Sequence, residues 1–90
     1  ADALSLGLVA EVVPTDKTVS AALELAVEIA AQAPLAVRAA KAAVKRAHES
    51  ALSSGIEQER AAFVELFDTE DQVEGMEAFL EKRRPRWKGR

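Results

Sequence analysis

A short β-branched segment with no possible strand partner constrains this chain most. Residues 8–13, Leu-Val-Ala-Glu-Val-Val, suit an extended strand, and Pro14 closes the segment. Every later segment has the period of a helix, so the strand would find no β partner within these 90 residues. The sequence therefore predicts an all-α protein with one short N-terminal extended segment, which is a connector or pairs outside this chain.

About four helices follow, marked by capping residues and breaks. The first is predicted over 17–32, with its N-cap at 15 or 16, and the second over 34–52, opened by Pro34. Ser53-Ser54-Gly55 is expected to break the pattern before a third helix over 56–67. The capping box Thr69-Glu70-Asp71-Gln72 starts a fourth helix, which ends before Pro85. These helices predict a small bundle.

The chain is short and has no covalent or metal stabiliser. It contains no cysteine, and its one histidine is His48, so neither a disulfide nor a clustered metal site is available. Chains of this size bury only about 60% of their unfolded surface and are marginally stable alone. Residues 1–6, Ala-Asp-Ala-Leu-Ser-Leu, also resemble the last turn of a helix ended by Gly7, and a helix this short does not nucleate itself. We therefore expect preceding structure and a partner surface.

Charge is unevenly distributed. The net charge of -3 argues against a general nucleic-acid binder. Acidic residues dominate 57–81, whereas 82–90 reads KRRPRWKGR, with six basic side chains and no acid. Such an end has a local anionic partner or is solvated. No apolar run reaches membrane-spanning length and no signal-peptide pattern opens the chain, so no membrane partner is expected.

Two charged stripes are candidate sites. One is a row of carboxylates on the fourth helix, either an acid–base pair or, as we favour, a solvated face. The other is a basic row on the second helix, either a phosphate contact or, as we favour, a wet face. The rows are Glu70, Glu74, Glu77 and Glu81, and Arg38, Lys41, Lys45 and His48. Neither supports a catalytic or metal-ligating residue, and no reaction class emerges from spacing alone.

Whole phrases of the sequence are more specific. Residues 3–14 resemble an "A…GLV.EVVP" stretch, and Ala33-Pro34-Leu35-Ala36 with Lys41 resembles "P.A…K". Residues 59–85 resemble "E…F…F.TED..EGM.AFLEKR.P". In this order, over essentially the full chain, they resemble the C-terminal helical region of the crotonase (enoyl-CoA hydratase/isomerase) family.

The resemblance implies a division of labour. Crotonase-type enzymes bind an acyl-CoA thioester in an N-terminal ββα-spiral core, where two backbone N–H groups stabilise the enolate and glutamates handle protons. Those parts would precede Ala1, so residues 1–90 would be a lid and trimerisation domain, inactive alone. The whole enzyme would be a lyase of fatty-acid metabolism, a homo-trimer or hexamer, in the cytoplasm or the mitochondrial matrix. Coenzyme A would be part of the substrate, and no other cofactor is expected.

The resemblance also implies two ligand contacts. Phe79 would line the acyl end of a pocket, unless it is plain core. Lys82 would reach the 3′-phosphate or adenine region of coenzyme A bound mainly by a neighbouring protomer, unless it belongs to a solvated tail. The alternative function is a stand-alone helical module without enzymatic role, which self-associates through the small residues Ala39, Ala40 and Ala43.

Overall fold

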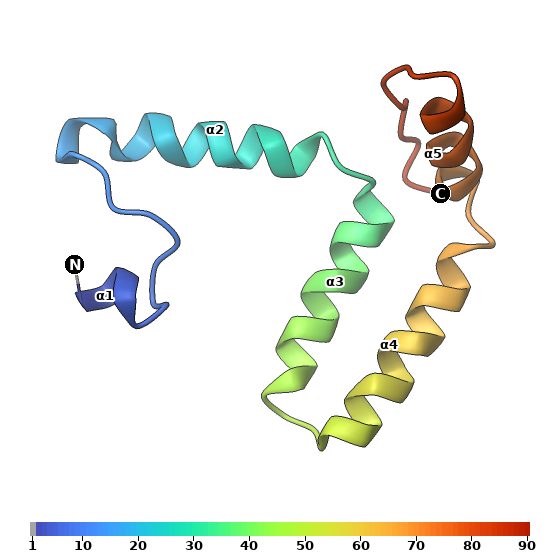
Figure 1. Cartoon of the computed structure of the whole chain (residues 1–90), viewed down its shortest axis with the longest axis horizontal. Coiled ribbons are helices and arrows are strands. Elements are labelled where there is room, and N and C mark those ends of the chain that lie inside the picture. The colour runs from blue at the N-terminus through green and yellow to red at the C-terminus, as the bar shows by residue number, and fades with distance from the viewer. Residues whose placement is uncertain (1) are drawn as a thin grey trace.

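The chain is helical throughout its structured parts (Figure 1). The computed structural model describes residues 2–90. In chain order its elements are α1 (Asp2–Ser5), the 3-10 turn η1 (Thr15–Lys17), α2 (Thr18–Ala30), α3 (Pro34–Ala47), α4 (Leu52–Leu66) and α5 (Glu70–Leu80). Residues 2–90 contain no strand, so the predicted all-α class is confirmed and residues 8–13 are an irregular connector.

Three local signals in the sequence act as predicted. Gly7 follows α1 with φ 73°, a left-handed backbone that glycine adopts without cost. Pro34 occupies the first turn of α3, where its missing N–H has no partner to lose. The hydroxyl of Thr69 accepts a 3.2 Å hydrogen bond from the backbone N–H of Gln72 and caps α5.

Three predicted boundaries are wrong. The second helix ends at Ala47 instead of residue 52, and Ser53-Ser54-Gly55 lies inside α4 instead of before it. The break falls at Ala51, whose extended backbone (ψ 149°) starts α4, and the Gly55 N–H already donates to the Ala51 carbonyl at 2.9 Å. Neither residue 15 nor 16 caps α2, because both are taken up in η1.

The helices form an open arrangement instead of a closed bundle. α3 and α4 pack against each other as an antiparallel pair, and α2 turns away from α3 by 112° (Figure 1). No single helix in the described part of the chain is long and apolar enough to cross a membrane; only the bent pair of 15–30 with 34–47 passes that test, by length and composition.

Most apolar side chains remain exposed in this arrangement. The chain exposes 7790 Å², about half as much again as the roughly 5,100 Å² of a compact protein of its mass. Its radius of gyration is 16.6 Å, against about 12 Å for a compact domain of this length. Ala78 is the one fully buried apolar residue among those described, whereas Val19, Leu23 and Val27 on α2 are all more than 60% exposed. The described residues therefore leave a large apolar face exposed.

Candidate functional site

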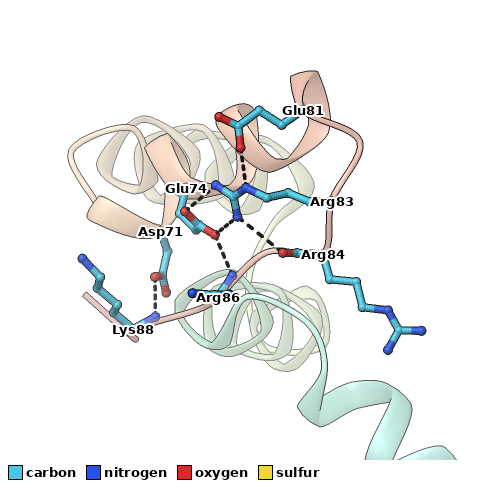
Figure 2. A network of polar contacts seen from close by, with 7 residues as sticks. All are labelled: Asp71, Glu74, Glu81, Arg83, Arg84, Arg86 and Lys88. Atoms are coloured by element: carbon cyan, nitrogen blue, oxygen red, sulfur yellow. Dashed lines mark hydrogen bonds and ion pairs between the residues drawn. The ribbon is translucent and has the colours of Figure 1, made fainter.

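The C-terminal tail, residues 83–90, folds back along the acidic face of α5. Arg83 forms a two-bond fork with Glu74, with Nη1 2.6 Å from Oε1 and Nη2 3.1 Å from Oε2 (Figure 2). The backbone N–H of Arg86 adds a third bond to Glu74, at 2.7 Å. Arg83 Nε also donates to Glu81, so one guanidinium joins two carboxylates. The basic end of the chain thus has its anionic partner within the same chain.

These contacts change the acid–base character of α5. The fork with Arg83, helped by the Arg86 N–H, lowers the pKa of Glu74 to about 2. Hydrogen bonds from Lys88 and Arg90 lower the pKa of Glu70. The carboxylates of Glu74 and Glu81, which accept hydrogen bonds from Arg83, raise the pKa of its guanidinium. Carboxyl groups held ionised in this way are poor general acids near neutral pH.

Most of this stripe is the exposed helix face that was expected, because Glu70, Glu77 and Glu81 are exposed and only Glu74 is half-buried. Glu70, Glu74 and Glu81 all form ion pairs with tail residues. Glu77 alone is exposed without an ion pair among the described residues. The acidic row therefore holds the tail against α5. We call the ion pairs of Glu70, Glu74 and Glu81 with Arg83, Lys88 and Arg90 the clasp. The geometry gives no support to a catalytic pair of carboxylates.

A second anchor of the tail is the buried carboxylate of Asp71, which the sequence did not single out. Asp71 is 3% exposed and lies in the first turn of α5. Its two oxygens accept the backbone N–H groups of Lys88 at 2.7 Å and Gly89 at 2.8 Å, and its own N–H donates to the Arg90 carbonyl at 3.0 Å. The Thr69-Glu70-Asp71 phrase was the available signal, but only the folded tail reveals what Asp71 binds.

A third anchor is Trp87, which ties the tail to the corner between α2 and α3. Its indole Nε1–H donates to the Ala31 carbonyl at 2.8 Å. Its ring lies over Gly75, where an added Cβ would sit 3.2 Å and 3.3 Å from two ring carbons. Gly89 approaches Pro34 in the same region. The tail thereby links α5 to the start of α3, which fixes the relative placement of two parts of an otherwise open molecule.

Beside Trp87 lies an open apolar hollow of about 420 Å³. Phe63 and Phe67 pack edge to face there, with ring centroids 5.2 Å apart. The hollow is framed by α3, α4, α5 and the tail, and its lining comprises Ala33, Leu35, Ala36, Phe63, Leu66, Phe67, Thr69, Asp71, Gln72, Gly75, Met76 and Trp87. It is suited to apolar groups.

The two predicted ligand-contact residues lie together at the far end of α5, outside this hollow. Phe79 is 80% exposed, so it is not core within the described chain. Lys82 is exposed and follows the helix with φ 54°. Its N–H donates to the Phe79 carbonyl at 3.3 Å, and the next N–H, of Arg83, reaches the Ala78 carbonyl at 3.0 Å. These two bonds form the Schellman motif that ends many helices.

The basic row lies along α3, with His48 at the C-cap. Its members form no ion pair with residues 2–90 and are exposed, as a solvated helix face would be: Arg38, Lys41, Lys45 and His48. Across the described residues, no three metal-ligating side chains come together. The side chains that converge are therefore those that hold the tail against α5.

Comparisons with known proteins agree in sequence and in shape. The enoyl-CoA hydratase/isomerase family model matches residues 1–90. The 2,3-dehydroadipyl-CoA hydratase of Escherichia coli K12 is 50% identical over 84 residues, which cover 93% of this chain and 33% of that protein.

Two crystal structures show the same helical arrangement. An enoyl-CoA hydratase/isomerase from Mycobacterium paratuberculosis matches with TM-score 0.92 and 35% identity over 99% of this chain and 35% of its own. Enoyl-CoA hydratase from Bacillus anthracis matches with TM-score 0.92 and 39% identity over 99% and 34%. The chain thus spans about a third of these relatives, and its open arrangement is the one that the helices have inside those longer proteins.

Proposed function

Because the chain belongs to the enoyl-CoA hydratase/isomerase family, also called the crotonase family, we propose that it is the C-terminal helical part of an enzyme acting on acyl-CoA thioesters. Its role is to cover the active site and to help assemble a homo-trimer or hexamer. The whole enzyme is a lyase of acyl-CoA metabolism in the cytoplasm, or in the mitochondrial matrix of a eukaryote. Coenzyme A enters as part of the substrate, without a further cofactor.

The observation that carries this proposal is the open apolar surface. Exposed apolar patches of this extent mark surfaces that other protein covers. The exposed side chains of α2, with those of Leu4, Leu6 and Leu8 before it, favour a docking face for a core and for neighbouring protomers. The TM-scores of 0.92 support this reading, since relatives about three times as long hold the helices in the same way.

The chemistry within the chain favours a supporting role. The pKa values of Glu70 and Glu74 are lowered, because both carboxylates accept hydrogen bonds from residues of the tail. An acid or base for enoyl-CoA hydration would need a pKa near the working pH and a dry pocket. We therefore assign the catalytic glutamates and the oxyanion hole to an N-terminal core, and we expect the 90 residues alone to be inactive.

Phe79 and Lys82 are the proposed ligand contacts. Phe79 offers an exposed aromatic ring for the acyl end of a pocket completed by other protein. Lys82 offers an exposed ammonium, without an ion pair among residues 2–90, for the 3′-phosphate of coenzyme A. The Lys82→Ala variant of the whole enzyme should raise KM for acyl-CoA, and an unchanged KM would reject this contact.

A graft tests the proposal as a whole. The 90 residues replace the matched third of the Escherichia coli 2,3-dehydroadipyl-CoA hydratase, and the same enzyme with that third deleted is the control. We expect hydration of an enoyl-CoA by the graft and none by the deletion variant or by the isolated chain. Hydration by the isolated chain, or a native gene product with no more mass than these 90 residues, would overturn the proposal.

The stand-alone module remains the second candidate, but the structure weakens it. Ala39 and Ala43 are half-buried and, with Ala40, line a hollow shared with α4 of the same chain. The small-residue face is therefore partly used internally. A dimer of the isolated chain that Ala40→Leu dissociates would restore this candidate.

A further inference from the structure

The corner that carries Lys82 has an unfavourable backbone held in place by charged side chains. Lys82 has φ 54°, in the left-handed region, and is the only non-glycine residue among those described with a positive φ. It occupies the Schellman position at which helices normally place glycine, because a Cβ there crowds the neighbouring carbonyl. Such backbone persists only where the surrounding structure determines it, and it is concentrated at functional sites.

The side chains of Glu81 and Arg83, on either side of Lys82, hold this backbone conformation in place. Arg83 Nε donates to Glu81 Oε2 (Figure 2). Because these two residues flank Lys82 in the chain, their side chains close the turn that contains it. The same guanidinium donates two hydrogen bonds to Glu74, which lies about two helical turns before Glu81, at 2.6 Å and 3.1 Å. Glu74 also accepts the Arg86 N–H at 2.7 Å, which fixes the chain beyond the turn. The Lys82 side chain itself has no ion pair among residues 2–90 and is left exposed.

We propose that Glu74 and Arg83 are positioning residues, which hold the turn at Lys82 so that its ammonium points to the phosphate of bound coenzyme A. The inference rests on the proposed function. A lysine side chain on a loose end would lose more conformational freedom on binding than one on a fixed turn. The hydrogen bonds between Arg83 and Glu74 thus increase the affinity for the ligand without contacting it. The reaction of the acyl group takes place in the N-terminal core.

The test uses the whole enzyme expressed from the gene that encodes the chain. KM and kcat for acyl-CoA are measured for the parent, Glu74→Gln, Lys82→Ala and the double variant. Glu77→Gln is the matched control, since Glu77 lies on the same face without an ion pair in the described chain. Arg83→Gln opens the fork from its other side in case Glu74→Gln folds poorly.

We expect Glu74→Gln and Arg83→Gln to raise KM by about 3- to 10-fold with kcat within about twofold, as for lost uniform binding. Glu77→Gln should change neither constant. In the Lys82→Ala background, Glu74→Gln should have no further effect, because there is no ammonium left to position. An equal rise in KM in both backgrounds, or a fall in kcat alone, would overturn the inference.

Hydrogen exchange of peptides within residues 81–86 separates this inference from the proposed function. Faster exchange in Glu74→Gln than in Glu77→Gln is expected, because the amides after Lys82 lose their support. Unchanged exchange would overturn the positioning role whatever the kinetics show. Faster exchange with no change of KM in Lys82→Ala would retain the clasp but reject coenzyme A as the ligand of Lys82.

Discussion

Replacing Asp71 by Asn should release the C-terminal tail from α5. The two carboxylate oxygens accept the N–H groups of Lys88 at 2.7 Å and Gly89 at 2.8 Å, at a site that is 3% exposed. Asn keeps one acceptor oxygen but turns an NH2 group towards the other N–H donor. One hydrogen bond to a charged group is lost and one donor is left unsatisfied, which together cost about 2–3 kcal/mol.

Hydrogen exchange measures this cost directly in the whole protein. A loss of about 2–3 kcal/mol predicts exchange of the Lys88 and Gly89 amides that is roughly 30- to 150-fold faster. Asp68→Asn is the matched control, because Asp68 is exposed and no hydrogen bond or ion pair joins its side chain to the tail among residues 2–90. Equal exchange in the two variants would refute the assignment of Asp71 as the buried anchor.

Three further outcomes are expected. Lys82→Gly should raise the free energy of unfolding in urea by about 0.5–1 kcal/mol, because glycine relieves the φ of 54°, yet it should also raise KM for acyl-CoA. Gly75→Val should move the Trp87 ring, which already lies 3.2 Å from a Cβ at that position, cost about 2 kcal/mol, and shift tryptophan emission to the red. The Glu74–Arg83 fork should stabilise the protein fully above pH 4.5 and progressively less as the pH falls to about 2, because the pKa of Glu74 is lowered in the folded protein. The difference between the unfolding free energies of the parent and Glu74→Gln should therefore decrease as the pH falls over that range.

Local features of the fold could be predicted from the sequence where one residue type determines the backbone. Gly7, Pro34 and Thr69 end or start their helices as their chemistry requires. Gly55 misled the prediction, because a glycine inside a helix costs only about 1 kcal/mol relative to alanine and the rest of α4 outweighs it. A single breaker residue therefore locates a boundary only when no longer helical run overrides it.

The attachment of the tail to α5 could not be predicted from the sequence, because its hydrogen bonds join residues that are far apart in the chain. The sequence indicated an acidic helix and a basic tail, but it did not show that Arg83 turns back to Glu74 or that Trp87 reaches Ala31. In the sequence, Asp71 is one of many helix carboxylates. Only the structure shows that it accepts the N–H groups of Lys88 and Gly89. The corner of Phe79 and Lys82 was located through family phrases, and its left-handed turn follows only from the bonds around it.

The exposed apolar face also makes the stability of this chain a matter of mass action. Apolar area stabilises a fold only once it leaves water, at about 25 cal/mol per Å². With one fully buried apolar residue among those described, Ala78, most of that stabilisation becomes available only when another surface covers α2 and the connector. Folding and docking of these helices are then one equilibrium, and for the isolated 90 residues the folded fraction rises with the concentration of a covering protein supplied as a separate chain. Dilution of such a two-chain complex should therefore unfold the helices.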